Sequence, residues 1–353
     1  NWTPVPAGDG QRLALNVQAN GVQYQAYSLS FTEPWLGGRR PNSFSFSLNH
    51  SIQRTGQALD ASTSQFIKVN SATVGLGRQL RVPDDYFTLS NSLSYSQYNT
   101  QNYALIPGAA TGTFNNITLN TTLARNSIDN PTYTRRGSSL SLSVNLTPPY
   151  SLLNPDHPSS SQWIEFHKWI FDASWFTPIV GKLVLNTRAH FGYLGNYNSN
   201  RAIGPFERFK MGGAGLGYNG GGNFLVGTDY VGLRGYDDPN SAFAVPTAQQ
   251  GQSGGIAFNK YVLEMRYPVS LNPAATVYVL AFAEAGNAYD SYQNYNPYKL
   301  YRSAGVGARI FMSAFGLLGF DFGHGFDSVV PIGVNPGKQD FNKFHFIIGQ
   351  QIR

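Results

Sequence analysis

The sequence predicts an all-β protein, a transmembrane antiparallel β-barrel of about fourteen strands, and three observations support this fold class. Only 12% of the 353 residues are charged, about half the share in a typical soluble domain, whereas 14% are aromatic. Apolar residues alternate with Ser, Asn, Gln and Thr in segments of roughly ten residues, the length of a tilted membrane strand. No run approaches the ~18 consecutive apolar residues of a membrane helix. This combination is typical of a barrel that faces lipid outside and water inside.

Strands near the N-terminus are predicted by alternating apolar and polar residues. Residues 1–10 hold two Pro and two Gly, which interrupt a strand. Alternation then begins at Leu13 and resumes after Asn20-Gly21, a strong hairpin signal. Every second residue of a strand lies on the same face. The side chains expected to face lipid are therefore Leu13, Leu15, Phe44, Phe46, Leu140 and Leu142.

The same period of two predicts the remaining strands. No segment shows a sustained period of 3.6 residues, so no helix is predicted. Aromatic residues near the strand ends fit a girdle at the membrane interface: Tyr24, Tyr86, Tyr98, Trp163 and Trp175. The predicted strands cover 13–19, 27–32, 43–49, 65–79, 86–99, 114–126, 138–146, 163–176, 182–194, 256–268, 275–288, 301–312, 315–323 and 342–350. A soluble sandwich or propeller is the alternative, but it would carry more surface Lys and Glu.

The stretch 204–238 is the most unusual part of the sequence because it is so rich in glycine. Each glycine loses much backbone entropy on ordering, so this run is not expected to form the interior of a helix or strand. A connection this long is expected to be functional or disordered. It ends on Leu233-Arg234-Gly235-Tyr236, where one arginine lies between Gly232 and Gly235. We therefore expect a loop tip that carries one cation to a defined place.

Residues 205–213, PFERFKMGG, precede this tip, and together the two segments resemble the sixth extracellular loop of BamA-type outer-membrane assembly proteins. In that family a (V/L)RG(F/Y) tip folds back into the barrel lumen. Weaker similarities cover much of the chain, at 32–35 (TEPW), 129–133 (DNPTY), 282–289 (FAEAGNAY) and 344–350 (FHFIIGQ). The terminal aromatic residue of the family is replaced here by Ile352-Arg353.

The resemblance implies a domain organisation. Barrels of the family have sixteen strands and follow periplasmic domains, and the first strand predicted here is similar to the third strand of the family. Residues 1–353 are therefore expected to be part of a sixteen-stranded barrel, without its first two strands and periplasmic domains. The loop at about 204–255 is expected to be extracellular and to fold into the lumen.

The implied function is folding and insertion of β-barrel proteins in the outer membrane of a Gram-negative bacterium, by strand templating at a lateral seam. An unpaired strand edge is costly in hydrocarbon, so an opened seam would pair with a client strand. The implied partners are unfolded outer-membrane protein clients, accessory outer-membrane lipoproteins of an assembly complex, and outer-membrane lipids. The last strand would form the seam with Phe344, Phe346, Ile348 and Gly349.

Charged residues inside predicted strands indicate the lumen face. Glu264 and Arg266 lie two residues apart, so they share a face, and lipid would penalise both charges. Glu284 and Asp321 are expected in the lumen for the same reason. We predict that Arg234 pairs with Glu264, Glu284 or both, since a guanidinium makes strong paired hydrogen bonds with carboxylates. The alternative is the ordinary polarity of any barrel lumen.

No constellation of an enzyme is found, so no catalytic residue, metal site or cofactor is predicted. The six histidines are scattered, and no GxSxG elbow is present. Nucleic-acid binding is not expected either, because the net charge of +6 comes without a long Lys/Arg run. Three other functions remain open: a protein-translocation pore of the same superfamily, a passive porin, and a barrel that binds a ligand with its loops at 100–113 and 204–255.

Overall fold

The computed structural model describes residues 10–38, 42–54, 64–103, 109–153, 163–198, 203–213, 228–249, 251–272, 274–312, 316–331 and 338–348. In this part of the chain, fourteen strands form one antiparallel sheet in the order β1 to β9 followed by β12 to β16. The predicted all-β class and strand number are confirmed. None of the helices in the described ranges has the length and apolar content needed to cross a membrane.

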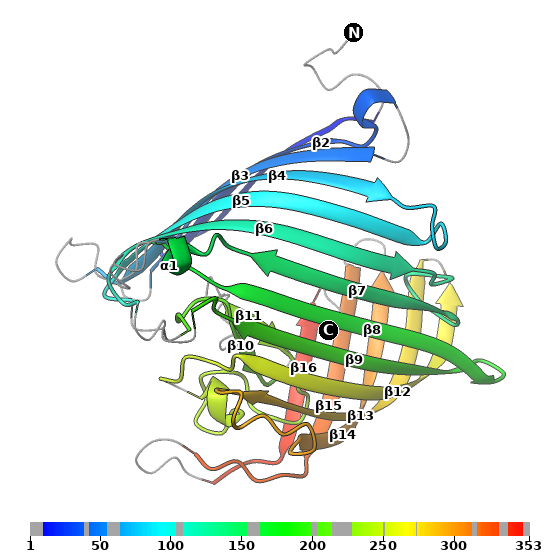
Figure 1. Cartoon of the computed structure of the whole chain (residues 1–353). Helices are drawn as coiled ribbons and strands as arrows, with labels where there is room; N and C mark the ends of the chain where they lie inside the picture. The colour runs from blue at the N-terminus through cyan, green and yellow to red at the C-terminus, as the bar shows by residue number, and fades with distance from the viewer. Residues whose placement is uncertain are drawn as a thin grey trace. The chain divides into compact units, whose positions relative to one another are not determined.

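The strands of the sheet follow one another along the chain, and neighbours in sequence are mostly neighbours in the sheet (Figure 1). Their bounds are β1 Arg12–Asn20, β2 Tyr24–Glu33, β3 Asn42–Arg54, β4 Phe66–Gln79, β5 Phe87–Gln101, β6 Gly112–Asn126, β7 Gly137–Leu146, β8 His167–Val180, β9 Leu183–Gly195, β12 Ala257–Asn272, β13 Ala275–Tyr289, β14 Tyr301–Met312, β15 Gly316–Gly325 and β16 Asn342–Ile348. In the described residues, helices are limited to α1 Tyr150–Leu153 and the 3-10 turns η1 Leu36–Gly38 and η2 Pro246–Ala248.

Two short strands lie inside the glycine-rich stretch, where no strand was predicted. β10 (Arg208–Met211) and β11 (Thr228–Val231) pair in parallel as a separate sheet. Both occupy segments without glycine, so the entropy cost that disfavours a strand does not apply to them. The glycine-rich segment between them, at 214–227, lies outside the described residues.

The chain divides into two compact units, of which the first comprises Asn1–Ala124, Leu142–Trp169 and Gly195–Phe206. Within it, the strand register aligns apolar residues in rows across β1 to β5. One row holds Leu13, Phe31, Phe46, Val74 and Leu93, and a second holds Leu15, Leu29, Leu48, Ala72 and Tyr95. The opposite face carries Ser, Asn and Thr at the intervening positions. One face of this sheet is therefore apolar, as expected of a face toward lipid.

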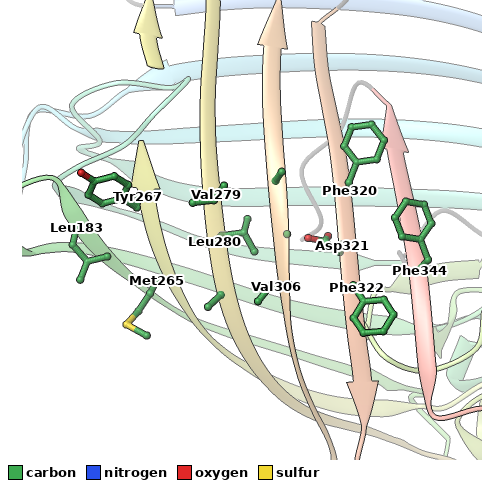
Figure 2. Close-up of a pocket in the computed structure, with 13 residues that line it drawn as sticks. Leu183, Met265, Tyr267, Val279, Leu280, Val306, Phe320, Asp321, Phe322 and Phe344 are labelled. Carbon is green, nitrogen blue, oxygen red and sulfur yellow. The ribbon is translucent and has the colours of Figure 1, made fainter. Parts of the chain in front are cut away.

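The second unit comprises Arg125–Ser141, Ile170–Leu194 and Glu207–Arg353. In β12 the side chains alternate strictly between buried and exposed from Lys260 to Tyr267. The exposed row across the unit runs Met265, Ala281, Val306, Phe322 and Phe344. Figure 2 shows these apolar side chains around a hollow of about 650 Å³ on that face. The buried row runs Glu264, Phe282, Gly305 and Gly323, so Glu264 lies on the face away from this hollow, whereas Asp321 is among the residues that line the hollow.

Candidate functional site

The loop tip Leu233–Tyr236 lies on the buried face of β12 to β15, and its side chains are almost completely covered. Leu233 is held by a hydrogen bond from its backbone N to the carbonyl oxygen of Gly213, at 3.0 Å. Gly235 adopts φ +89°, a conformation that other residues rarely take. This conformation turns the chain so that the side chains of Arg234 and Tyr236 both contact strands of the sheet. Arg234 is only 1% exposed.

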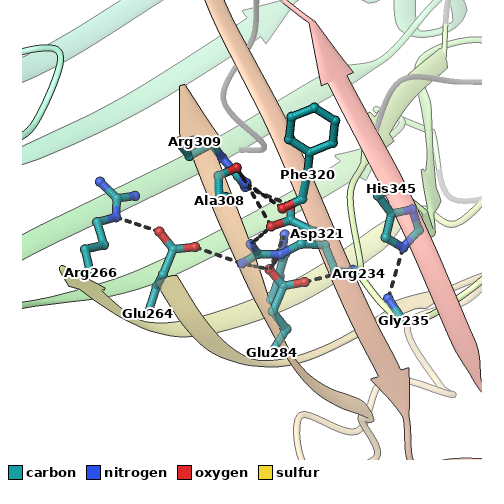
Figure 3. A network of polar contacts seen from close by, with 11 residues as sticks. Arg234, Gly235, Glu264, Arg266, Glu284, Ala308, Arg309, Phe320, Asp321 and His345 are labelled. Carbon is teal, nitrogen blue, oxygen red and sulfur yellow. Dashed lines mark hydrogen bonds and ion pairs between the residues drawn. The ribbon is translucent and has the colours of Figure 1, made fainter. Parts of the chain in front are cut away.

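Glu284, on β13, is the main partner of Arg234 (Figure 3). The backbone N of Arg234 donates to Glu284 Oε2 at 2.9 Å, and the Nε atom donates to Glu284 Oε1 at 2.8 Å. Nη2 lies 2.7 Å from the same Oε1. Because one carboxylate binds both the backbone and the side chain, it fixes the position and the orientation of the arginine.

Glu264, on β12, is the second partner, and Arg234 shares it with Arg266. Nη2 of Arg234 donates to Glu264 Oε2 at 3.0 Å, and Nε of Arg266 donates to Glu264 Oε1 at 2.6 Å. The structure therefore brings Arg234 onto both acidic residues that the sequence singled out. Besides Arg234, the ion pair identified for Glu264 is with Arg266 Nε, at 2.6 Å, and the ion pair identified for Glu284 is the longer one with Lys260 Nζ, at 3.8 Å.

Asp321, on β15, completes the buried cluster. Nη1 of Arg234 lies 3.5 Å from Asp321 Oδ1. Arg309 donates to both oxygens of this carboxylate, from Nη1 at 2.8 Å and from Nη2 at 2.7 Å. The sequence placed Asp321 in the lumen but did not connect it to Arg234 or to Arg309. Strand register decides the contact between Asp321 and Arg309, because Asp321 lies beside Gly307 of β14, two residues from Arg309.

The environment of Arg234 keeps its guanidinium charged. The guanidinium carbon lies 3.6 Å from the centre of the Phe282 ring, within the range of a cation–π contact. Burial lowers the pKa of Arg234, but the adjacent carboxylates of Glu284, Glu264 and Asp321 outweigh it and raise the pKa above its ordinary value. The cluster is therefore an ionic lock between the loop and three strands.

Glycines of β14 and β15 form a cradle that the sequence pattern did not reveal. A Cβ atom on Gly323 would lie 2.8 Å from the backbone N of Gly235, and one on Gly325 would lie 2.8 Å from its carbonyl oxygen. The glycines alternate along both strands, at Gly305 and Gly307 and at Gly323 and Gly325, so they share one face. Glycine within a strand often marks a close approach of another backbone, so the alternating glycines were the sequence feature that could have predicted this contact.

Tyr236 and His345 secure the rest of the tip. Gly235 N donates to His345 Nε2 at 3.2 Å, so this ring nitrogen is an acceptor and the imidazole proton lies on Nδ1. Tyr236 Oη donates to the carbonyl oxygen of Arg302 at 2.7 Å and accepts from Asp327 N at 3.3 Å. Burial raises the pKa of Tyr236, which keeps the phenol protonated as a donor. His345 was not predicted, because its partner lies 110 residues away.

The predicted seam residues lie on β16, at one end of the sheet order. In the described part of the chain, β16 pairs only with β15. Phe344 and Phe346 are 65% and 45% exposed and lie on the apolar face, whereas Ile348 is the last residue of the strand. Gly349 lies outside the described residues. None of the seam residues contacts the loop tip through an identified hydrogen bond in the described ranges.

The base of the loop contains a buried lysine that gives a testable pH dependence. Lys210, on β10, is 2% exposed, and its Nζ donates to Asn240 Oδ1 at 2.7 Å. Burial lowers the pKa of Lys210 from 10.5 to about 8. Between these values the unfolded loop binds more protons than the folded loop, so the stability of the folded loop rises with pH and levels off above 10.5.

We expect the Lys210→Met loop to gain less resistance to protease than the wild-type loop when the pH rises from about 7.5 to about 10, because only the wild type loses a buried charge. The cleavage rates of the two proteins are compared at each pH, which cancels the pH dependence of the protease itself. A ratio that stays constant across this range would contradict a depressed lysine pKa.

No group of three or more His, Asp or Glu residues in the described ranges is arranged to hold a metal ion. The charged groups of the site instead pair with one another. Their arrangement supports positioning of a loop and offers no identified nucleophile with an adjacent base.

Comparisons with known proteins identify the family and the fold. The model of the Omp85 superfamily domain matches residues 7–352. The fold is similar to that of BamA from Haemophilus ducreyi lacking POTRA domains 1–3, with a TM-score of 0.66 and 18% identity over 96% of this chain and 63% of the other. It is also similar to CdiB from Escherichia coli, with a TM-score of 0.54 and 14% identity over 92% of this chain and 52% of the other. The chain thus spans less than two thirds of these solved proteins. No curated protein matches the sequence significantly.

Proposed function

Because the chain belongs to the Omp85 superfamily, we propose that it folds and inserts β-barrel proteins in the outer membrane of a Gram-negative bacterium. Its partners would be unfolded outer-membrane protein clients, accessory lipoproteins of an assembly complex, and outer-membrane lipids. No cofactor or enzymatic step is part of this proposal, since strand pairing and membrane burial drive the process.

The observation that carries the proposal is the ionic lock, which holds the loop tip against strands near the end of the sheet order. Arg234, Glu264 and Glu284 fix the loop tip against the inner face of β12 to β14. In the described residues β16 pairs with β15 alone, and we propose that its other edge forms the lateral seam at which a client strand pairs. The loop would fill and stiffen the lumen beside this edge while the client strand pairs.

A translocation pore of the same superfamily and a passive porin are the competing functions. The likenesses to BamA and to CdiB both concern the fold alone. A passive porin does not require an arginine buried among three carboxylates, because ordinary polar side chains are sufficient to line a water-filled channel. The three functions differ in what the purified protein does in a membrane.

The test is client folding in liposomes that contain the full-length protein. We expect an outer-membrane β-barrel client, diluted from urea, to fold faster than in empty liposomes, as followed by its heat-dependent migration on gels. Conductance measured in the same membrane is expected to be small and flickering. A large, steady conductance without faster client folding would instead support a passive pore, and transport of one partner protein would support translocation.

A further inference from the structure

A second hollow, of about 400 Å³, lies on the apolar face of β1 to β5, within the first unit. Its apolar lining consists of Leu15, Tyr27, Leu29, Leu48, Ala72 and Tyr95. Ala72 lies in the same row as Leu48 and Tyr95, and as the smallest of the three it leaves the space between them. The two tyrosines flank this space, so the hollow is a groove on a face that the fold turns toward lipid.

Polar residues close one end of this groove, where an apolar surface is expected. His50 and Asn70 are exposed and directly opposite each other, with His50 Nδ1 2.7 Å from Asn70 Oδ1. Gln97 is the next residue in the same row, and its Nε2 donates to Asn115 Oδ1 at 3.3 Å. Polar side chains on the lipid face of a barrel are destabilising near the membrane centre and tolerated near the interface.

A cationic residue, Lys68, lies beyond the polar row, toward the same strand ends. Lys68 is two residues from Asn70 on β4, which is roughly 7 Å along the strand. Its Nζ lies 5.0 Å from the centre of the Phe66 ring, so the side chain extends toward the end of the strand. The acidic residues described in β1 to β5 and their turns lie at the opposite strand ends: Glu33, Asp84 and Asp85. Among the described residues, Lys68 supplies a positive charge at this end that complements an anion.

We propose that this groove binds one phosphate-bearing membrane lipid. An acyl chain would occupy the space over Ala72, and the phosphate would lie at the polar row formed by His50 and Asn70. When His50 Nδ1–H donates to Asn70 Oδ1, the amide N–H groups of Asn70 can donate to a phosphate. The ammonium group of Lys68 supplies a positive charge nearer the strand end. This site lies on the unit that does not hold the ionic lock, so it is separate from the proposed assembly function.

Native mass spectrometry of the detergent-solubilised full-length protein tests the proposal. The protein is titrated with phosphatidylglycerol and with diacylglycerol carrying the same acyl chains. We expect one phosphatidylglycerol to be retained about tenfold more strongly than diacylglycerol, the effect of one or two charge-assisted hydrogen bonds. Ala72→Trp should lower the retention of both lipids, because the indole fills the groove. Lys68→Gln should lower the retention of phosphatidylglycerol alone, and Lys68→Arg should restore it.

Leu76→Trp is the matched control, because Leu76 lies on the same strand and face but outside the groove. This variant should retain both lipids as the wild type does. Equal retention of the two lipids by the wild type, or unchanged retention of phosphatidylglycerol by Ala72→Trp or Lys68→Gln, would overturn the proposal. If Ala72→Trp does not fold, as judged by heat-dependent migration on gels, the proposal is tested by the comparison of the two lipids and by the Lys68→Gln variant.

Discussion

Arg234→Ala is expected to release the loop tip while the sheet still folds. The substitution removes the closest identified cation from the buried Glu284, whose other identified ion pair, with Lys260 Nζ, is 3.8 Å long, and breaking a buried ion pair in this way costs roughly 3–5 kcal/mol. The fraction of molecules with the tip docked should fall by more than about 100-fold relative to the undocked state. Limited proteolysis should then cleave within 204–255, and the rate of client folding in liposomes should drop with it.

Arg302→Ala is the matched control for this substitution. Arg302 also pairs with a carboxylate, Asp327, at 2.8 Å, but its side chain is 65% exposed. An exposed ion pair of this kind contributes little to stability, so the loop should stay protected and client folding should continue at the wild-type rate. If Arg234→Ala behaved like Arg302→Ala in both measurements, the ionic lock would have no part in the mechanism.

Gly323→Ala is expected to displace the same tip without removing any charge. The new Cβ would lie 2.8 Å from Gly235 N and 3.0 Å from Gly235 Cα, both of which are backbone atoms that cannot rotate away. Overpacking of this kind costs roughly 1–3 kcal/mol, which corresponds to about a 5- to 150-fold loss of the docked state. Protease sensitivity of the loop and slower client folding should appear together, as they do for Arg234→Ala.

Gly204→Ala serves as the control, because a Cβ atom there meets no atom within 4 Å. It lies at the start of the same loop, so it tests whether any glycine substitution in this region has the same effect. A Gly323→Ala protein whose loop resists protease as well as that of Gly204→Ala would show that the cradle does not hold the tip.

Local sequence patterns were sufficient to predict the strands. Alternation with a period of two depends only on residues within one strand, so the ends of β13 and β14 were predicted to within one residue. The same period assigned Glu264 and Arg266 to the buried face and Met265 to the exposed face. β8 was less accurate: it was predicted at 163–176 and spans His167–Val180, because the aromatic residues around Trp163 continue the apolar pattern before the strand begins.

The long-range parts of the site required the tertiary structure. Asp321 and His345 meet the loop tip, and Arg309 meets Asp321, only because register across β13 to β16 aligns residues that lie up to 110 positions from Gly235. The close approach of the Gly323 backbone to Gly235 likewise depends on how the loop enters the sheet.

The sequence by itself thus determined the fold class and the faces of the strands, because both follow from short-range periodicity and from the cost of placing charge in lipid. The glycine-rich loop and its family resemblance identified Arg234. Only the tertiary structure decided how the contacts are shared: Glu284 binds both the backbone and the side chain of Arg234, while Glu264 is divided between Arg234 and Arg266. The physical reason is that partner choice depends on separations of a few ångströms between strands, which a one-dimensional pattern does not encode.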